Sequence, residues 1–310
     1  MEQGSGGTGR RKFLKCMAWA GTGLVWTLEG GLLRSRALAE ERPPAGRGGF
    51  RFVQISDTHV GFKGEVNREP LATLREALAR IDALDPQPDF LIHTGDLSHA
   101  QKAGAFDDLA QTLGGARVKQ VFFVPGEHDV FVDGGVEFLR RFGKGTTGQG
   151  WRSFDHRGVH FIGLVNVLSY KAEGLGLIGA DQLAWLARDL EPISSSTPVV
   201  VYAHVPLWAV YPKWGWVTGD GELALAQLRR FGSVTVLNGH IHQILQKVEG
   251  HVSFHTAAST AFPQPAPGTA PAPGPMKVPA ERLRSLLGLR TVTYTEGAGA
   301  LAVVDSPLAG

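Results

Sequence analysis

The sequence predicts an α/β fold, and three observations support this prediction. From residue 50 onward, short runs rich in β-branched and aromatic residues alternate with amphipathic stretches of helical periodicity. Five of the strand-like runs end in short polar motifs that contain His, Asp or Glu. The 310 residues, of which 43% are hydrophobic and 19% charged, are enough to bury a large core in one or two domains.

The expected elements alternate in order along the chain. We expect strands at 51–55, 90–93, 120–124, 199–203 and 234–237, and helices at 70–84, 106–113, 180–190 and 223–231. Pro70 suits the first turn of the first helix, in which Leu71, Leu74, Leu78 and Ile81 share one face. Hairpins are expected at 151–165, around Arg157-Gly158, and at 244–256, around Glu249-Gly250.

The C-terminal part of the chain changes in composition. Residues 263–279 are rich in Pro, Ala and Gly, which predicts a loop or covering strip without core-forming capacity. The strand-like runs beyond it, 290–295 and 300–304, are too short to fold alone, so we expect them to return to the sheet. The region from 40 to 310 is therefore predicted to form a single domain.

Residues 1–39 are typical of a twin-arginine signal peptide. The sequence RRKFLK at 10–15 resembles the twin-arginine export signal, a weakly apolar stretch follows at 16–28, and Ala37-Leu38-Ala39 forms a small-x-small cleavage site. A membrane anchor is the alternative, but the apolar run is short and Glu29 interrupts it. We expect transient contact with the twin-arginine export machinery and a periplasmic or other extracytoplasmic location.

Charge and cysteine content narrow the chemistry. Residues 1–39 hold six of the 31 Lys and Arg residues but two of the 29 acids, so the remainder is close to neutral. No nucleic-acid-binding surface is therefore predicted. The one cysteine, Cys16, lies in the predicted signal, which leaves His and carboxylate side chains as the metal ligands of the mature protein.

The motifs at the strand ends supply such ligands. They are Asp57-Thr58-His59, Gly95-Asp96, Gly126-Glu127-His128-Asp129, His204 and Gly239-His240-Ile241-His242. Imidazoles and carboxylates hold metals of intermediate hardness, and the carboxyl ends of strands in an α/β sheet face a common crevice. The spacing of two between Asp57 and His59, repeated at His240 and His242, places each pair on one side if the strand continues.

The ordered set of motifs resembles the calcineurin-like metallophosphoesterases from Asp57 to His242, and arguably from residue 50 to the C-terminus. The resemblance implies two packed mixed β-sheets flanked by helices, a four-layer sandwich, with a dinuclear metal site. It also implies a role for each motif residue. Asp57, His59 and His242 would bind the first metal, Asp96 would bridge both, Glu127, His204 and His240 would bind the second, His128 would contact the phosphate, and Asp129 would orient His128.

The mechanism that the resemblance implies is direct hydrolysis of a small phosphoester. A hydroxide that bridges two metals attacks phosphorus in line, and protonated His128 donates to the leaving oxygen. Within the metallophosphoesterases, we favour the branch that is similar to cyclic-nucleotide phosphodiesterases. A phosphomonoesterase and a non-catalytic metal-containing binding protein remain alternatives. Folding before export favours iron or manganese, with zinc as the other option.

Glu127 departs from the family pattern, which has asparagine at this position. Together with Asp57 and Asp96, Glu127 would give the centre three carboxylates. With a hydroxide the centre would carry about four negative charges, against about four or five positive charges on two metal ions. Such a centre would polarise phosphate less and would hold a trivalent ion more readily. Three interpretations stay open: altered metal or substrate choice, a tolerated oxygen ligand, or a crippled enzyme.

Substrate contacts are predicted less directly. His99 lies close to Asp96 in the sequence, and Trp208 and Trp214 belong to an aromatic loop at 205–219 directly after His204. Such rings could stack against a base or an acyl chain. The alternative is a loop that buries its own aromatic residues against the sheet.

Overall fold

A computed structural model of the chain describes residues 24–29, 32–37, 48–102, 104–170 and 176–309, which belong to two units. In the first unit, Met1–Ala45, strand β1 (Leu24–Glu29) pairs antiparallel with β2 (Leu32–Ala37). The RRKFLK sequence and residues 38–39 of the predicted cleavage motif lie outside the described residues, so the signal peptide and the domain boundary at residue 40 stay predictions. Among the described residues, no helix has the length and apolar content needed to span a membrane.

The second unit, Gly46–Gly310, contains two mixed sheets. The five-stranded sheet has the order β13 (Ala302–Pro307), β12 (Gly288–Thr295), β3 (Gly49–Ile55), β4 (Phe90–His93) and β5 (Val121–Phe123). The six-stranded sheet has the order β10 (Leu245–Glu249), β11 (Val252–Thr256), β9 (Val234–Asn238), β8 (Val199–Ala203), β7 (Val159–Gly163) and β6 (Arg152–His156). Strands β3, β4 and β5 run parallel, as do β7, β8, β9 and β11.

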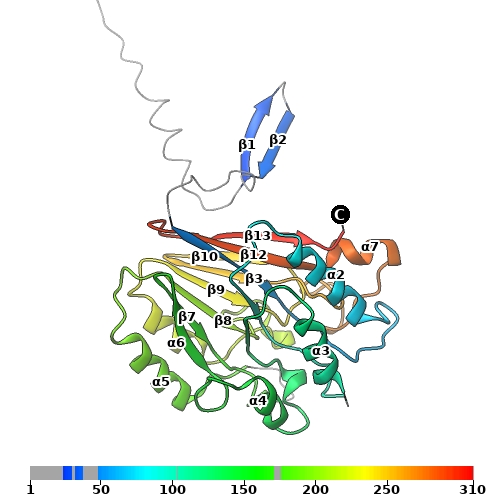
Figure 1. Ribbon diagram of the computed structural model, residues 1–310, viewed down its shortest axis with the longest axis horizontal. Coiled ribbons are helices and arrows are strands. Elements are labelled where there is room, and N and C mark those ends of the chain that lie inside the picture. The colour runs from blue at the N-terminus through cyan, green and yellow to red at the C-terminus, as the bar shows by residue number, and fades with distance from the viewer. Residues whose placement is uncertain (1–23, 30–31, 38–47, 103, 171–175, 310) are drawn as a thin grey trace, which may run out of the picture. The chain divides into compact units, whose positions relative to one another are not determined.

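The sheets pack face to face, and helices cover their outer faces (Figure 1). Along β3, Phe50 and Phe52 point into the core between the sheets, whereas Val53 and Ile55 point to the helices, as alternation along a strand requires. Helices α2 (Pro70–Asp82), α3 (Ala105–Gly114), α4 (Val136–Phe142) and α7 (Ala280–Leu286) pack on the five-stranded sheet, and α5 (Ala180–Leu190) and α6 (Gly221–Leu228) pack on the other. The predicted four-layer α/β sandwich is confirmed.

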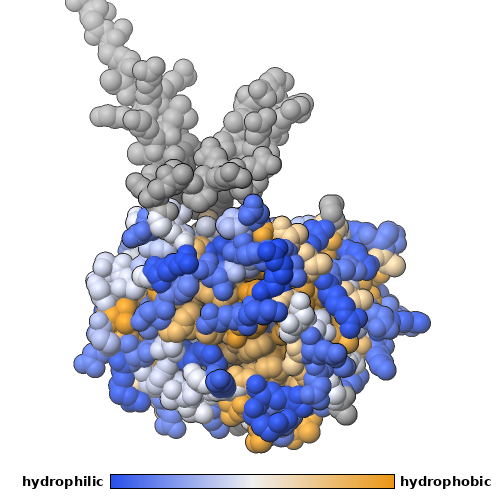
Figure 2. All heavy atoms as spheres, in the orientation of Figure 1, coloured by the Kyte–Doolittle hydropathy of each residue, from blue (hydrophilic) through white to orange (hydrophobic). Residues whose placement is uncertain are grey.

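The C-terminal tail completes the five-stranded sheet, as expected from its short strand-like runs. Strand β12 pairs antiparallel with both β3 and β13. Residues 263–279 carry no helix or strand, as their composition predicts. Polar residues cover most of the face seen in Figure 2, and hydrophobic residues gather near its centre.

Four short elements of the second unit were not expected. They are α4, α7 and the 3₁₀ helices η3 (Glu127–Asp129) and η4 (Pro212–Trp214). Helices α4 and α7 each have seven residues, too few for a clear amphipathic period. Neighbouring layers rather than their own sequence stabilise such short helices, as the burial of Phe138 and Leu283 indicates.

Candidate metal centre

The five motifs meet at the carboxyl ends of β3, β4, β5, β8 and β9. Backbone hydrogen bonds join the loops: the Asp57 amide donates to the Gly95 carbonyl (3.0 Å), and the Gly239 amide donates to the His204 carbonyl (3.0 Å). The bond from Asp57 to Gly95 joins two loops that follow strands of the five-stranded sheet. The bond from Gly239 to His204 joins two loops that follow strands of the six-stranded sheet. The His240 amide donates to the Asp57 carboxylate (3.0 Å) and connects the two sheets.

Five of the seven predicted ligand residues have a strained backbone. Asp57, His59, Asp96, His240 and His242 all have positive φ, between 40° and 72°. Non-glycine residues avoid this region unless the surrounding structure holds them there, and such residues cluster at functional sites. The predicted alignment of Asp57 with His59 required a continuing strand, and this condition is not met, because β3 ends at Ile55.

Two motif glycines are required by close approach. A Cβ on Gly126 would collide with the carboxylate and amide of Asp96, and a Cβ on Gly95 would collide with the His204 ring. Gly95 also has a φ of +98°, which L side chains rarely adopt. Both glycines let neighbouring loops pack tightly around the convergence point.

Four ligand residues form a first buried cluster: Asp57, His59, Asp96 and His242. The His59 Nε2 atom lies 3.2 Å from His242 Nε2 and 3.4 Å from Asp96 Oδ2. His242 Nε2 also lies 3.4 Å from Asp57 Oδ1. His242 Nδ1 donates to the Phe262 carbonyl (2.6 Å), so its Nε2 lone pair points into the cluster.

Three further residues form a second buried cluster: Glu127, His204 and His240. Glu127 Oε2 lies 2.9 Å from His204 Nε2, and Glu127 Oε1 lies 3.1 Å from His240 Nδ1. His204 Nδ1 donates to the Thr94 carbonyl (2.7 Å), and the other ring nitrogen, Nε2, faces the cluster and can offer its lone pair to a metal. Among the described residues, Glu127 Oε2, His204 Nε2 and His240 Nδ1 are buried and have no hydrogen-bond partner, although they lie close together.

Asp96 connects the two clusters. Its Oδ2 atom lies 3.4 Å from His59 Nε2 in the first and 3.5 Å from His204 Nε2 in the second. Donor atoms on one metal at 2.0–2.2 Å are about 3.0 Å apart in octahedral and about 3.3 Å apart in tetrahedral geometry. The distances observed between donor atoms match these donor–donor distances, and the donor atoms face one another. The residues present therefore fit metal coordination, with Asp96 between the two clusters.

Neighbouring histidines lower the pKa values of two acids of the centre, Glu127 and Asp57. Burial alone would raise the pKa of Glu127, but His240 and His204 outweigh it and hold the pKa well below its usual value. Burial would likewise raise the pKa of Asp57, but His242 and His204 lower it on balance. Both residues can thus serve as carboxylate ligands at neutral pH.

Asp129 differs from its predicted role. Its carboxylate accepts hydrogen bonds from the backbone amides of Leu97 (2.9 Å), Ser98 (2.8 Å) and Gly126 (3.0 Å), and so ties two site loops together. Burial and the nearby Asp96 raise its pKa to about 7. Among the described contacts none joins this carboxylate to the His128 ring, so Asp129 positions His128 only through the backbone.

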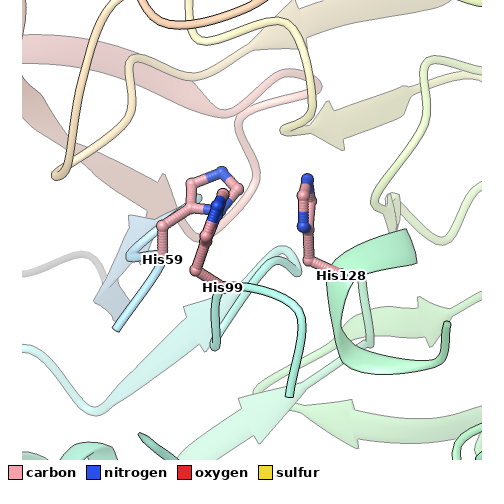
Figure 3. Close-up of side chains that lie close together, drawn as sticks. All are labelled: His59, His99 and His128. Atoms are coloured by element: carbon pink, nitrogen blue, oxygen red, sulfur yellow. The ribbon is translucent and has the colours of Figure 1, made fainter. Parts of the chain in front are cut away.

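His128 and His99 lie at the mouth of the centre (Figure 3). The His128 amide donates to Asp96 Oδ1 (3.0 Å), and its half-buried ring stacks on His99 with centroids 4.8 Å apart. Burial, followed by His128, lowers the pKa of His99 to about 4. The structure therefore places His99 beside His59, with their Nδ1 atoms 3.3 Å apart, and its contact with substrate stays a prediction.

The two tryptophans predicted to contact substrate lie elsewhere. Trp208 is 8% exposed and packs on Phe254 in the core of the six-stranded sheet, so its proposed substrate contact is wrong. Trp214 packs edge-to-face on Tyr211 and Trp216, within its own loop. The alternative interpretation, a loop that buries its own aromatic residues, describes this segment.

Several residues of the site were missed by the sequence analysis. The Tyr170 hydroxyl lies 3.4 Å from His240 Nε2, and Gln264 Nε2 donates to the His240 carbonyl (2.9 Å). The Phe262 ring packs on His59 and His242, with centroids 4.7 and 4.6 Å away. None of the three belongs to a motif, and no signal in the sequence distinguishes them from ordinary loop residues.

Comparison with known proteins agrees with this centre. The class that the fold and site define is that of metal-dependent phosphoester hydrolases. The family described as calcineurin-like phosphoesterase matches residues 50–244, and the chain belongs to this family.

Relatives and solved structures are similar over most of the chain. A 3′,5′-cyclic-nucleotide phosphodiesterase of Nostoc is 25% identical over 68% of this chain and 78% of its own length. A probable cyclic nucleotide phosphodiesterase of Synechococcus is 31% identical over 62% of this chain and 74% of its own. A dimetal phosphatase from Danio rerio superposes with a TM-score of 0.62 at 15% identity, over 84% of this chain and 99% of its own, which shows the shared fold.

Proposed function

We propose that this chain hydrolyses phosphodiester bonds at a centre of two metal ions. The observation that supports this proposal is the pair of buried ligand clusters on either side of Asp96 Oδ2, 3.4 Å from His59 and 3.5 Å from His204. A carboxylate oxygen shared in this way can bridge two ions. The similarity to proteins named as cyclic-nucleotide phosphodiesterases favours a diester as substrate.

The roles of the residues follow from their placement. When bound, the two ions supply a nucleophile at neutral pH and neutralise charge on the phosphoryl oxygens. His128 is anchored through its amide to Asp96, and its half-buried ring reaches the mouth of the centre. Such a position suits a proton donor to the leaving oxygen. Asp129 keeps the Asp96 and Gly126 loops at a fixed separation.

We further propose that the protein is exported in folded form and carries iron or manganese. The RRKFLK sequence at 10–15 supports export. Folding in the cytoplasm would let the site acquire its metals before it meets the copper and zinc that raw affinity favours. Elemental analysis of protein purified from its native compartment tests this point, and stoichiometric zinc alone would contradict it.

Hydrolysis of phosphomonoesters is the second candidate. A relative in Danio rerio that is 25% identical over 67% of this chain is named a serine/threonine-protein phosphatase. The two candidates share the centre and differ only in which phosphoester is cleaved faster.

The test is a comparison of two chromogenic substrates with metal-loaded protein. We expect turnover of bis-p-nitrophenyl phosphate to exceed turnover of p-nitrophenyl phosphate. We expect His128→Ala to lower diester turnover by about 100-fold or more, the usual worth of a positioned proton donor. His251→Gln, at an exposed histidine in the β10–β11 turn, is the matched control. Faster monoester turnover would support the second candidate, and metal-loaded protein without any turnover would indicate a binding protein.

A further inference from the structure

Three imidazoles at the mouth of the centre converge from three different loops (Figure 3). His59 follows β3, His99 follows β4, and His128 belongs to η3. Each offers one ring nitrogen, and the three nitrogen atoms lie within 4.8 Å of one another. His59 has its Nε2 atom in the first cluster, so its Nδ1 atom is free to face the other two rings.

The spacing within this histidine cluster fits a metal ion. His59 Nδ1 lies 3.3 Å from His99 Nδ1. Two nitrogen ligands at 2.0–2.1 Å on tetrahedral zinc are about 3.3 Å apart. His128 Nδ1 is buried without a hydrogen-bond partner, and its ring is held only by stacking and edge contacts. The His128 ring can therefore turn toward an ion without breaking a hydrogen bond.

The surroundings also favour a cation here. The Phe62 ring packs on His99 with centroids 5.1 Å apart, and the Phe262 ring packs on His59 at 4.7 Å. Lys102, whose ammonium donates to the Gly61 carbonyl (2.8 Å), is a positive group near His99. Glu127 brings a third carboxylate into the centre, so two divalent ions and a hydroxide leave it close to neutral. The two-ion centre itself therefore repels a further cation little.

We propose that His59, His99 and His128 form a third metal site for a borderline divalent cation such as Zn²⁺, and that its occupancy suppresses hydrolysis. His59 would bridge the first ion through Nε2 and the third through Nδ1, and the proton on its Nδ1 would pass to solvent. His128 would give the lone pair of one ring nitrogen to the ion and could no longer take the doubly protonated form that donates to the leaving oxygen. Metal binding at this site does not depend on the proposed function, whereas the suppression rests on it.

The test counts metal ions and measures rates separately. Purified protein is dialysed against rising concentrations of free zinc, and the total number of bound metal ions per chain is measured by elemental analysis. We expect wild-type protein to rise from two metal ions to three. We expect His99→Gln to stop at two, and His251→Gln, the exposed control, to follow the wild type. His128→Asn gives a second variant that should also stop at two and needs no activity for its readout.

Rates are then followed over the same range of free zinc, each variant relative to its own maximum. We expect the rate of the wild type to fall by about tenfold or more as the third ion binds, and the rate of His99→Gln to stay level. Wild-type protein that stops at two ions, or variants that reach three, would overturn the site. A third ion that leaves the rate unchanged would overturn the suppression alone. Absence of turnover under all conditions would contradict the proposed function and leave the metal count as the test of the site.

Discussion

Replacement of Glu127 tests how charge governs the centre. Glu127→Gln keeps the length of the side chain and one oxygen ligand but removes the negative charge. The carboxylate lies 2.9 Å from His204 Nε2 and 3.1 Å from His240 Nδ1, so the change affects the second cluster directly. A contact to a charged group is worth about 1.5–3 kcal/mol, and we therefore expect affinity for the second ion to fall about 10–100-fold.

Turnover should change in the opposite direction. With one carboxylate fewer, the centre carries more net positive charge and stabilises the charge that develops on the phosphoryl oxygens more strongly. We expect diester turnover at saturating metal to rise about tenfold, equal to about 1.4 kcal/mol of transition-state stabilisation. Glu127→Asn should shift turnover by about tenfold or more, and its amide can also donate to a phosphate oxygen.

The assay combines metal content at defined free metal with kcat for bis-p-nitrophenyl phosphate at saturating metal. Glu127→Gln isolates the charge, and Glu127→Asn restores the residue that the family pattern has. Wild-type metal content and wild-type kinetics in both variants would remove Glu127 from the mechanism. A fall in turnover of Glu127→Gln at saturating metal would refute the charge argument.

Three further predictions concern the scaffold of the site. Gly126→Ala places a Cβ against Asp96, so we expect about 100-fold lower turnover. Gly114→Ala is the control, because a Cβ at Gly114 meets no atom within 4 Å. Arg290, 1% exposed, contacts Asp305, Gln54 and Thr256, and Arg290→Met should lower the free energy of unfolding in urea by about 3–5 kcal/mol. His160 contacts the carboxylates of Asp155 and Asp189. Burial lowers the pKa of His160, but the two carboxylates outweigh burial and raise the pKa above 6.5. The charged His160 therefore stabilises the fold fully below pH 6.5, and this stabilisation is lost as the pH rises past the raised pKa. The urea midpoint of the wild type should fall as the pH rises, and the midpoint of His160→Gln should fall less steeply.

The architecture could be predicted from the sequence because the central strands are fully buried, so each of them is a short, continuous run of apolar residues. Strands β4 and β8 and helix α5 begin and end where the pattern of apolar residues indicates. The ligand residues were found because each follows such a strand, and the parallel strands end at one edge. Their grouping into two clusters agrees with the grouping that the family resemblance implies. What each ion is and how it is held stay predictions.

The sequence could not predict how the loops aim their side chains. Asp57 and His59 would share one side if β3 continued, but both take left-handed backbone conformations, and their amides bind the Gly95 and Asp96 carbonyls. Asp129 follows His128 in the motif, yet its carboxylate binds amides more than 25 residues away at Leu97 and Ser98. Trp208 follows a ligand by four residues and still belongs to the core. Proximity in sequence says little about contact where the chain turns sharply.

The segment after the family match holds residues of the centre in place. Ser259 Oγ donates to the Asp57 carbonyl (2.7 Å) and accepts from the amides of Ala261 (2.8 Å) and Phe262 (3.1 Å). This arrangement holds the Phe262 carbonyl where it accepts the His242 Nδ1 proton. The tautomer of His242, and hence its lone pair toward the first cluster, thus depends on a residue beyond position 244. Ser259→Ala should therefore weaken metal binding in the first cluster more than in the second, because the second receives its orientation from Thr94 through His204.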